Sequence, residues 1–139
     1  MLAASKSPTM NPIEQMLDDA AQQYFRPLVT QYGLCWEERK STTTWAAVSA
    51  TGTVVRVELE CDRGALAISL GSINPGARLW GIEQISSLFP RVRQLSGGTQ
   101  RLSLQEQVGF LANHWDEVNE MFKAEQIAIT EKRLLSDGC

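Results

Sequence analysis

Residues 54–70 read VVRVELECDRGALAISL, and this stretch decides the fold class. Apolar and charged side chains alternate along its first half, and larger apolar residues alternate with Ala and Ser along its second half. A period of two residues is typical of β-strands that bury one face, and the Asp-Arg-Gly sequence between the halves favours a turn. The stretch therefore predicts an antiparallel β-hairpin.

The register of this hairpin follows from the length of its loop. The two apolar sets share one face only if the loop has an even number of residues, so the loop is either Arg63-Gly64 or residues 62–65. Both loops place Cys61 opposite Leu66. The face committed to the core carries Val57, Leu59, Ile68 and Leu70, and the free face carries Arg56, Glu58 and Glu60.

A second hairpin is expected just before the first, across residues 50–53. A two-residue turn at Thr51-Gly52 would place Val48 opposite Val55 and would turn Trp45 outward, beside the charged side chains of the next strand. A three-residue loop would instead bury Trp45. The sequence leaves both arrangements open.

Helical patterns flank the strands. Residues 11–14, Asn-Pro-Ile-Glu, combine an N-cap acceptor, a proline whose missing N–H is harmless there, and a glutamate that can reach back to the cap. They open an amphipathic helix that Pro27 is expected to kink or divide and that Gly33 ends. A short second helix is expected over residues 79–89, before Pro90.

A capping box at residues 103–106, Ser-Leu-Gln-Glu, opens the longest helix. A single helix from Leu104 to Leu135 would be roughly 48 Å long, more than a domain of this size can cover. We therefore expect it either to break near Ala124 or to pack its end on another chain. The second arrangement would produce a homodimer through the long C-terminal helix.

This order of elements predicts an α+β fold. Its antiparallel sheet has about four strands, of which residues 34–39 form the weakest, and it is flanked by an N-terminal helix, a short middle helix and a long C-terminal helix. The chain has 139 residues, which suits one domain. We expect a disordered tail over residues 1–10 and a single α+β domain over residues 11–139.

The charge of the chain limits its partners. A formal net charge of −3 and a pI near 5.2 argue against nucleic-acid binding, which needs a basic surface to release counterions. The N-terminal stretch lacks the apolar core of a signal peptide, and no apolar run approaches a membrane span. We expect a cytoplasmic chain whose partner is another protein.

Residues that could carry chemistry are few. Cys35, Cys61 and Cys139 are too far apart in sequence for a CxxC metal or redox motif, and we expect reduced thiols. His114 has no sequence signature of a nucleophile or an orienting acid beside it, so we expect a half-exposed helix histidine. The sequence thus predicts no catalytic site, no cofactor and no metal site.

Tryptophan is frequent, with four residues in this short chain. An outward Trp45 between Arg56 and Glu58 would make a protein-binding spot, because exposed aromatic and charged side chains together often anchor a partner. Trp80, at the mouth of a glycine-containing loop, is a second such position. The predicted partner-binding residues are Trp45, Arg56, Glu58, Glu60 and Trp80.

The order of these elements resembles that of small bacterial immunity proteins, which bind and neutralise a toxin. The resemblance rests on a helix that ends in Tyr-Gly-Leu at residues 32–34, the VELECDRGALAISL meander, a short helix with Leu-Trp-Gly-Ile at residues 79–82, and a long closing helix. It implies a non-enzymatic inhibitor that covers the toxin's active site with carboxylates and aromatic side chains.

Two other classes of protein remain open. The size, acidic pI and α-β-α order are also similar to type III secretion chaperones, homodimers that hold an unfolded segment of their effector, although these place a helix between their early strands. An enzyme whose polar site assembles across the fold is the third class.

Overall fold

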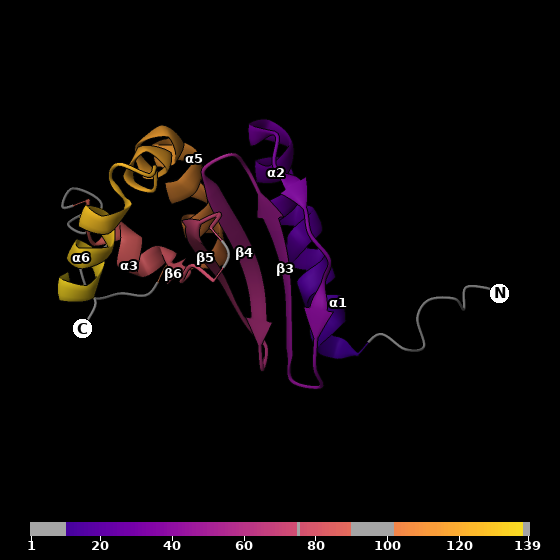
Figure 1. Ribbon diagram of the computed structural model, residues 1–139. Coiled ribbons are helices and arrows are strands. Elements are labelled where there is room, and N and C mark those ends of the chain that lie inside the picture. Colours follow the sequence, from indigo (N-terminus) through magenta and orange to yellow (C-terminus); the bar gives the residue numbers. More distant parts are fainter. Residues whose placement is uncertain (1–10, 75, 90–101, 138–139) are drawn as a thin grey trace.

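A computed structural model describes residues 11–74, 76–89 and 102–137 (Figure 1). The predicted tail over residues 1–10 and Cys139 lie outside these residues. The described elements form an antiparallel sheet with helices before and after it, so the predicted α+β class is confirmed. In Figure 1 the first helix lies beside the strands β3 (Trp45–Thr51) and β4 (Val55–Asp62). The last helix gathers with α3 (Ile82–Ser86) near the end of the sheet that carries β6 (Trp80–Gly81).

Within the described residues the sheet has six strands, two more than expected. Its centre is a meander of three long strands: β3 (Trp45–Thr51), β4 (Val55–Asp62) and β5 (Ala65–Ser72). Two-residue strands complete the edges: β1 (Cys35–Trp36) and β2 (Lys40–Ser41) pair with β3, and β6 (Trp80–Gly81) pairs with β5. The extra strands are too short to show a period of two in the sequence.

The register predicted for the β4–β5 hairpin is confirmed. Cys61 lies opposite Leu66, and Asp62 opposite Ala65, so the loop is the two-residue alternative Arg63-Gly64. Arg63 and Gly64 have φ angles of 54° and 91°. Positive φ at both central residues is the geometry of a type I′ turn, whose twist matches that of the flanking strands.

The β3–β4 turn lies further along the chain than predicted. Gly52 N–H donates to the Val55 carbonyl at 2.9 Å, and Val48 lies opposite Leu59 instead of Val55. The two-residue turn considered at Thr51-Gly52 is therefore wrong, because these residues continue the hydrogen-bonded ladder between β3 and β4. The displacement is an even number of residues, so every side chain lies on the face that the two-residue alternative gives it, and Trp45 points outward.

The first helix is divided, as Pro27 predicted. It comprises α1 (Pro12–Ala20), a π-helical turn η1 (Ala21–Phe25) and α2 (Arg26–Tyr32). The wide turn directly precedes Pro27, whose ring and missing N–H disturb the hydrogen bonding of the preceding turn. Gly33 ends α2 with a φ of 64°.

The edge formed by β1 and β2 contains a β-bulge. Trp36 lies opposite Ala50 on β3, whereas Lys40 lies opposite Ala47, so the edge strand holds one residue more than its partner between these pairs. Glu37 remains in the sheet, because its N–H donates to the Ser49 carbonyl at 2.8 Å.

The middle helix α3 (Ile82–Ser86) begins later than predicted. Trp80 and Gly81 form β6 instead, because Trp80 pairs with Leu70 at the sheet edge. The long helix breaks as expected: α5 (Leu104–Met121) and α6 (Ile127–Asp137) are separate, and Thr130 Oγ1 donates to the Met121 carbonyl at 2.7 Å. Of the two arrangements that the sequence left open, the structure shows the break near Ala124.

The core lies between the helices and one face of the sheet, which we call the inner face. The helices contribute Leu17, Phe25 and Leu111, each with 0% exposure. Burying each such side chain stabilises the folded state by about 1.5–3 kcal/mol, because it removes apolar area from water. The inner face of the sheet contributes Ala46, Ala50, Val55, Val57, Leu59, Cys61, Ile68 and Leu70.

Candidate functional site

The opposite side of the sheet, which we call the outer face, brings together four of the five predicted residues. Small side chains occupy the middle of this face, and the longer side chains surround them. The small residues are Ala47, Ser49, Ala67 and Ser69, and the larger ones are Trp45, Arg56, Glu58 and Glu60. Hydrogen bonds and ion pairs tie these side chains to one another across the strands.

Trp45 is held in place by Glu60. Its indole Nε1 donates to Glu60 Oε2 at 2.8 Å, and Trp45 is half-buried on the outer face. A hydrogen bond to a carboxylate is among the stronger side-chain interactions. The hydrogen bond fixes the orientation of the ring and satisfies its single polar group, the indole N–H.

Arg56 lies at the centre of an ionic network. Its Nε donates to Glu37 Oε1 at 3.0 Å, and Nη2 lies 4.0 Å from Glu58 Oε1 and 3.4 Å from Ser49 Oγ. Ser49 Oγ in turn donates to Glu58 Oε1 at 3.2 Å. Two carboxylates share one guanidinium here, so the network leaves negative charge on the outer face.

Trp80 does not belong to this surface. It is only 2% exposed and lies opposite Leu70, whose side chain points to the inner face. The guanidinium of Arg78 covers its ring at 4.0 Å from the centroid. The expectation that Trp80 anchors a partner at the surface is wrong, because pairing in β6 directs this side chain into the core.

The sequence did not single out Trp36, which is the exposed tryptophan of the structure at 46%. It meets Phe25 edge-on, with ring centroids 5.6 Å apart, and lines a groove of about 440 Å³ between α1 and the β1–β2 edge. Arg39 and Asp18 form an ion pair of 2.5 Å at this groove, and their hydrogen bond raises the pKa of Arg39.

Glu37 connects this groove to the outer face. It lines the groove beside Trp36 and also accepts the hydrogen bond from Arg56. The two surfaces therefore meet around the sheet edge. The pattern of residues 34–39 predicted a weak strand here, but the direction of Trp36 depends on its register with β3, which the two paired residues cannot fix from the sequence.

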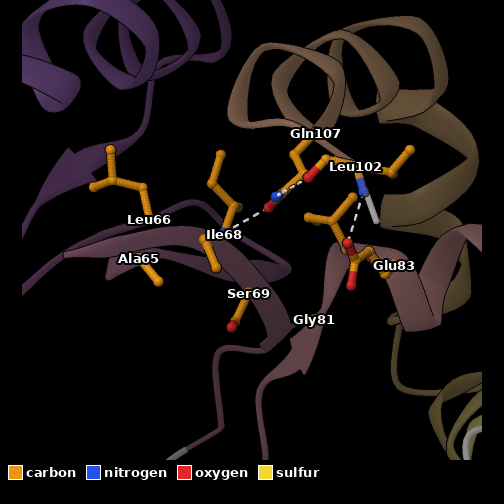
Figure 2. Close-up of a pocket in the computed structure, with 10 residues that line it drawn as sticks. Ala65, Leu66, Ile68, Ser69, Gly81, Glu83, Leu102 and Gln107 are labelled. Atoms are coloured by element: carbon orange, nitrogen blue, oxygen red, sulfur yellow. Dashed lines mark hydrogen bonds between the residues drawn. The ribbon is translucent and has the colours of Figure 1, made fainter. Parts of the chain in front are cut away.

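A second pocket, of about 270 Å³, lies at the opposite edge of the sheet (Figure 2). Here the side chain of Gln107, from α5, takes the place of a neighbouring strand. Its Oε1 accepts from the N–H of Ile68 at 2.8 Å, and its Nε2 donates to the Leu102 carbonyl at 3.0 Å. Glu83 Oε2 accepts from the Leu102 N–H at 2.7 Å, so two side chains hold both backbone groups of Leu102.

Replacing Gln107 by Ala should lower the free energy of unfolding by about 1–3 kcal/mol, because it leaves the buried Ile68 N–H without its acceptor. Gln107 is 5% exposed, so water cannot readily substitute. Urea denaturation measures the change, and amide exchange at Ile68 should accelerate. Gln105→Ala, at an exposed position on the same helix, is the control, with a change of less than about 0.5 kcal/mol. Unchanged exchange at Ile68 in the Gln107 variant would contradict the assignment.

His114 occupies a structural position. It is the kinked residue of α5, with φ −124° and ψ 22°, and its ring packs against Phe89 and Phe110 at centroid distances of 4.9 Å. Its Nδ1 lies 2.9 Å from Glu117 Oε1. The side chain is 26% exposed, as expected for a partly exposed helix histidine.

The two described cysteines are free thiols in different settings. Cys35 is exposed on β1, whereas Cys61 is buried with its sulfur 3.5 Å from that of Met16. Within residues 11–74, 76–89 and 102–137, His, Cys, Asp and Glu side chains do not form a group of three that could hold a metal ion.

Helices long and apolar enough to cross a membrane do not occur in the described part of the chain. In comparisons with known proteins, no family model, no curated protein and no solved structure matches the chain.

Proposed function

We propose that the chain is a non-enzymatic protein-binding module of the immunity type, which neutralises a toxin by binding it with the outer face. The observation that carries the proposal is the set of ordered side chains on that face: an indole held by Glu60, beside a guanidinium shared by Glu37 and Glu58. Side chains that are already ordered lose less conformational entropy when a partner binds.

The charge of the outer face supports a basic partner. Its carboxylates outnumber its one guanidinium, and Asp62 extends the acidic row along β4. A toxin domain that acts on nucleic acid carries a basic surface of complementary charge. Opposite charges speed the encounter of two proteins and select against acidic partners.

The order of the strands favours an inhibitor over a secretion chaperone. From β1 to β5 the strands follow one another without an intervening helix, whereas the chaperones place a helix between their early strands. A chain that remains strictly monomeric at micromolar concentration would count further against the chaperone.

The direct test is co-purification with a toxin-like C-terminal domain encoded beside the gene of this chain. Removing charge from the outer face by Glu58→Gln with Glu60→Gln should slow association with that domain on the order of tenfold at low salt, and less at high salt. Asp116→Asn with Glu120→Gln removes the same charge from exposed positions on α5 and is the control. Failure of the domain to bind, or equal slowing by both pairs, would refute the outer-face proposal.

A further inference from the structure

The edge of β5 is only partly covered by another strand. β6 pairs with Ser69 and Leu70, so residues 65–68 have no neighbouring strand on that side among the described residues. Figure 2 shows this stretch of β5 running beside the pocket, with Ala65 and Ser69 directed to one side of the strand and Leu66 to the other.

The alternation of the ladder identifies the backbone groups that face this edge. Ile68 N–H donates to Gln107, so Ile68 turns its peptide groups away from β4. In an antiparallel strand, the residue two positions away turns the same way. Leu66 therefore presents its N–H and carbonyl to the edge, whereas the Ser69–Gly81 pairing directs the Ile68 carbonyl to the β6 side of the ladder.

These groups border the pocket described above, which we call the β5-edge groove. The β5 backbone forms one wall, and Glu83, Leu102 and Gln107 form the other. The Gln107 side-chain amide accepts the hydrogen bond from the Ile68 N–H that the carbonyl of a neighbouring strand would otherwise accept. The groove has a volume of about 270 Å³.

We propose that the β5-edge groove binds an extended peptide segment of a partner protein, which pairs with Leu66 as an added strand. This mode of recognition uses main-chain hydrogen bonds for affinity and neighbouring side chains for selection. Leu66 and Leu102 favour an apolar peptide side chain, and the Glu83 carboxylate in the lining disfavours an acidic peptide. The site is separate from the outer face and goes beyond the function proposed above.

A peptide fits this edge better than a second copy of the chain does. A stable interface between two folded proteins buries at least about 1,000 Å² in total. The open edge is limited by the Arg63-Gly64 turn at one end and by Gln107 and Leu102 at the other, so it leaves room for strand pairing over a few residues. A single extended chain needs only the backbone groups of a few residues.

The test uses the full chain and a displayed library of random peptides of about eight residues, a common strand length. Selected peptides should slow amide exchange at Leu66 by about tenfold or more. N-methylation of alternate peptide residues should weaken binding by about tenfold, because it removes the donors that pair with β5. The proposal is overturned if no peptide binds with a Kd below about 1 mM, if binding leaves exchange at Leu66 unchanged, or if the edge pairs with a second copy.

A matched pair of variants tests the same site from the side of the protein. Leu66→Pro removes the N–H that faces the groove and spares the ladder with β4, so it should weaken the peptide by about tenfold. Leu66→Ala keeps that N–H and should weaken it less. Both variants should leave toxin binding on the outer face unchanged, so the two proposals can fail separately. If Leu66→Pro unfolds the chain, the N-methylated peptides still decide the question.

Discussion

Leu59→Ala should lower the free energy of unfolding by about 2–5 kcal/mol, the largest effect that we expect of a single substitution in the sheet. Leu59 has 0% exposure and lies between Val48 on β3 and Ile68 on β5. Its removal would leave a cavity at the centre of the inner face, where strands on both sides limit collapse. Urea denaturation followed by tryptophan fluorescence measures the change.

Glu58→Ala is the matched control on the adjacent residue. Glu58 points to the outer face, where its interactions with Ser49 and Arg56 are partly exposed. Such interactions contribute up to about 1 kcal/mol, so the control should cost much less than Leu59→Ala. Equal losses at the two positions would mean that the assignment of the inner and outer faces is wrong.

Gly71→Ala should cost about 1–3 kcal/mol, the typical penalty of inserting a group into filled space. A Cβ at this position would lie 2.4 Å from the Arg78 carbonyl oxygen and 3.1 Å from Leu79 Cδ2. The carbonyl belongs to the backbone that leads into β6, so it cannot move without shifting that strand. Thermal or urea denaturation measures the loss, and the near-UV signal of Trp80 should change.

Gly109→Ala is the matched control, because we expect it to raise the stability of the chain where Gly71→Ala lowers it. Gly109 lies inside α5, and apart from its chain neighbours and the backbone of its own helix no described heavy atom lies within 4 Å of the position of its added Cβ. Alanine favours a helix over glycine by roughly 0.5–1 kcal/mol, so this variant should be more stable than the wild type. If both glycine variants shift stability in the same direction, close packing at Gly71 is not the cause.

The central hairpin was predictable because its residues carry two signals at once. Alternation in residues 54–70 fixes which side chains share a face, and an even loop fixes their pairing. The face of Trp45 stayed open in the sequence between an even and an odd loop, and the observed even turn, two residues further along the chain, directs it outward. The helix breaks were also local, at Pro27 and near Ala124.

The remaining parts of the sites depend on contacts between distant residues. Trp36 and Trp80 lie on two-residue strands, where the neighbouring strand decides which way each side chain points. In the sequence Gln107 looks like any other helix residue. The hydrogen bond that it accepts from the Ile68 N–H joins residues 39 positions apart. Pattern and propensity carry no information about such pairs, so the groove beside β5 was not expected.

The bulge between Trp36 and Lys40 has a consequence for how the sheet can grow. Filament formation requires two compatible edges on each molecule, so that every added chain offers a fresh template to the next. Here the bulge interrupts one edge, and among the described strands the β5 side is the edge that stays regular enough to accept a strand. The molecule can therefore accept one guest strand but cannot pass the pairing on, which protects it from runaway polymerisation.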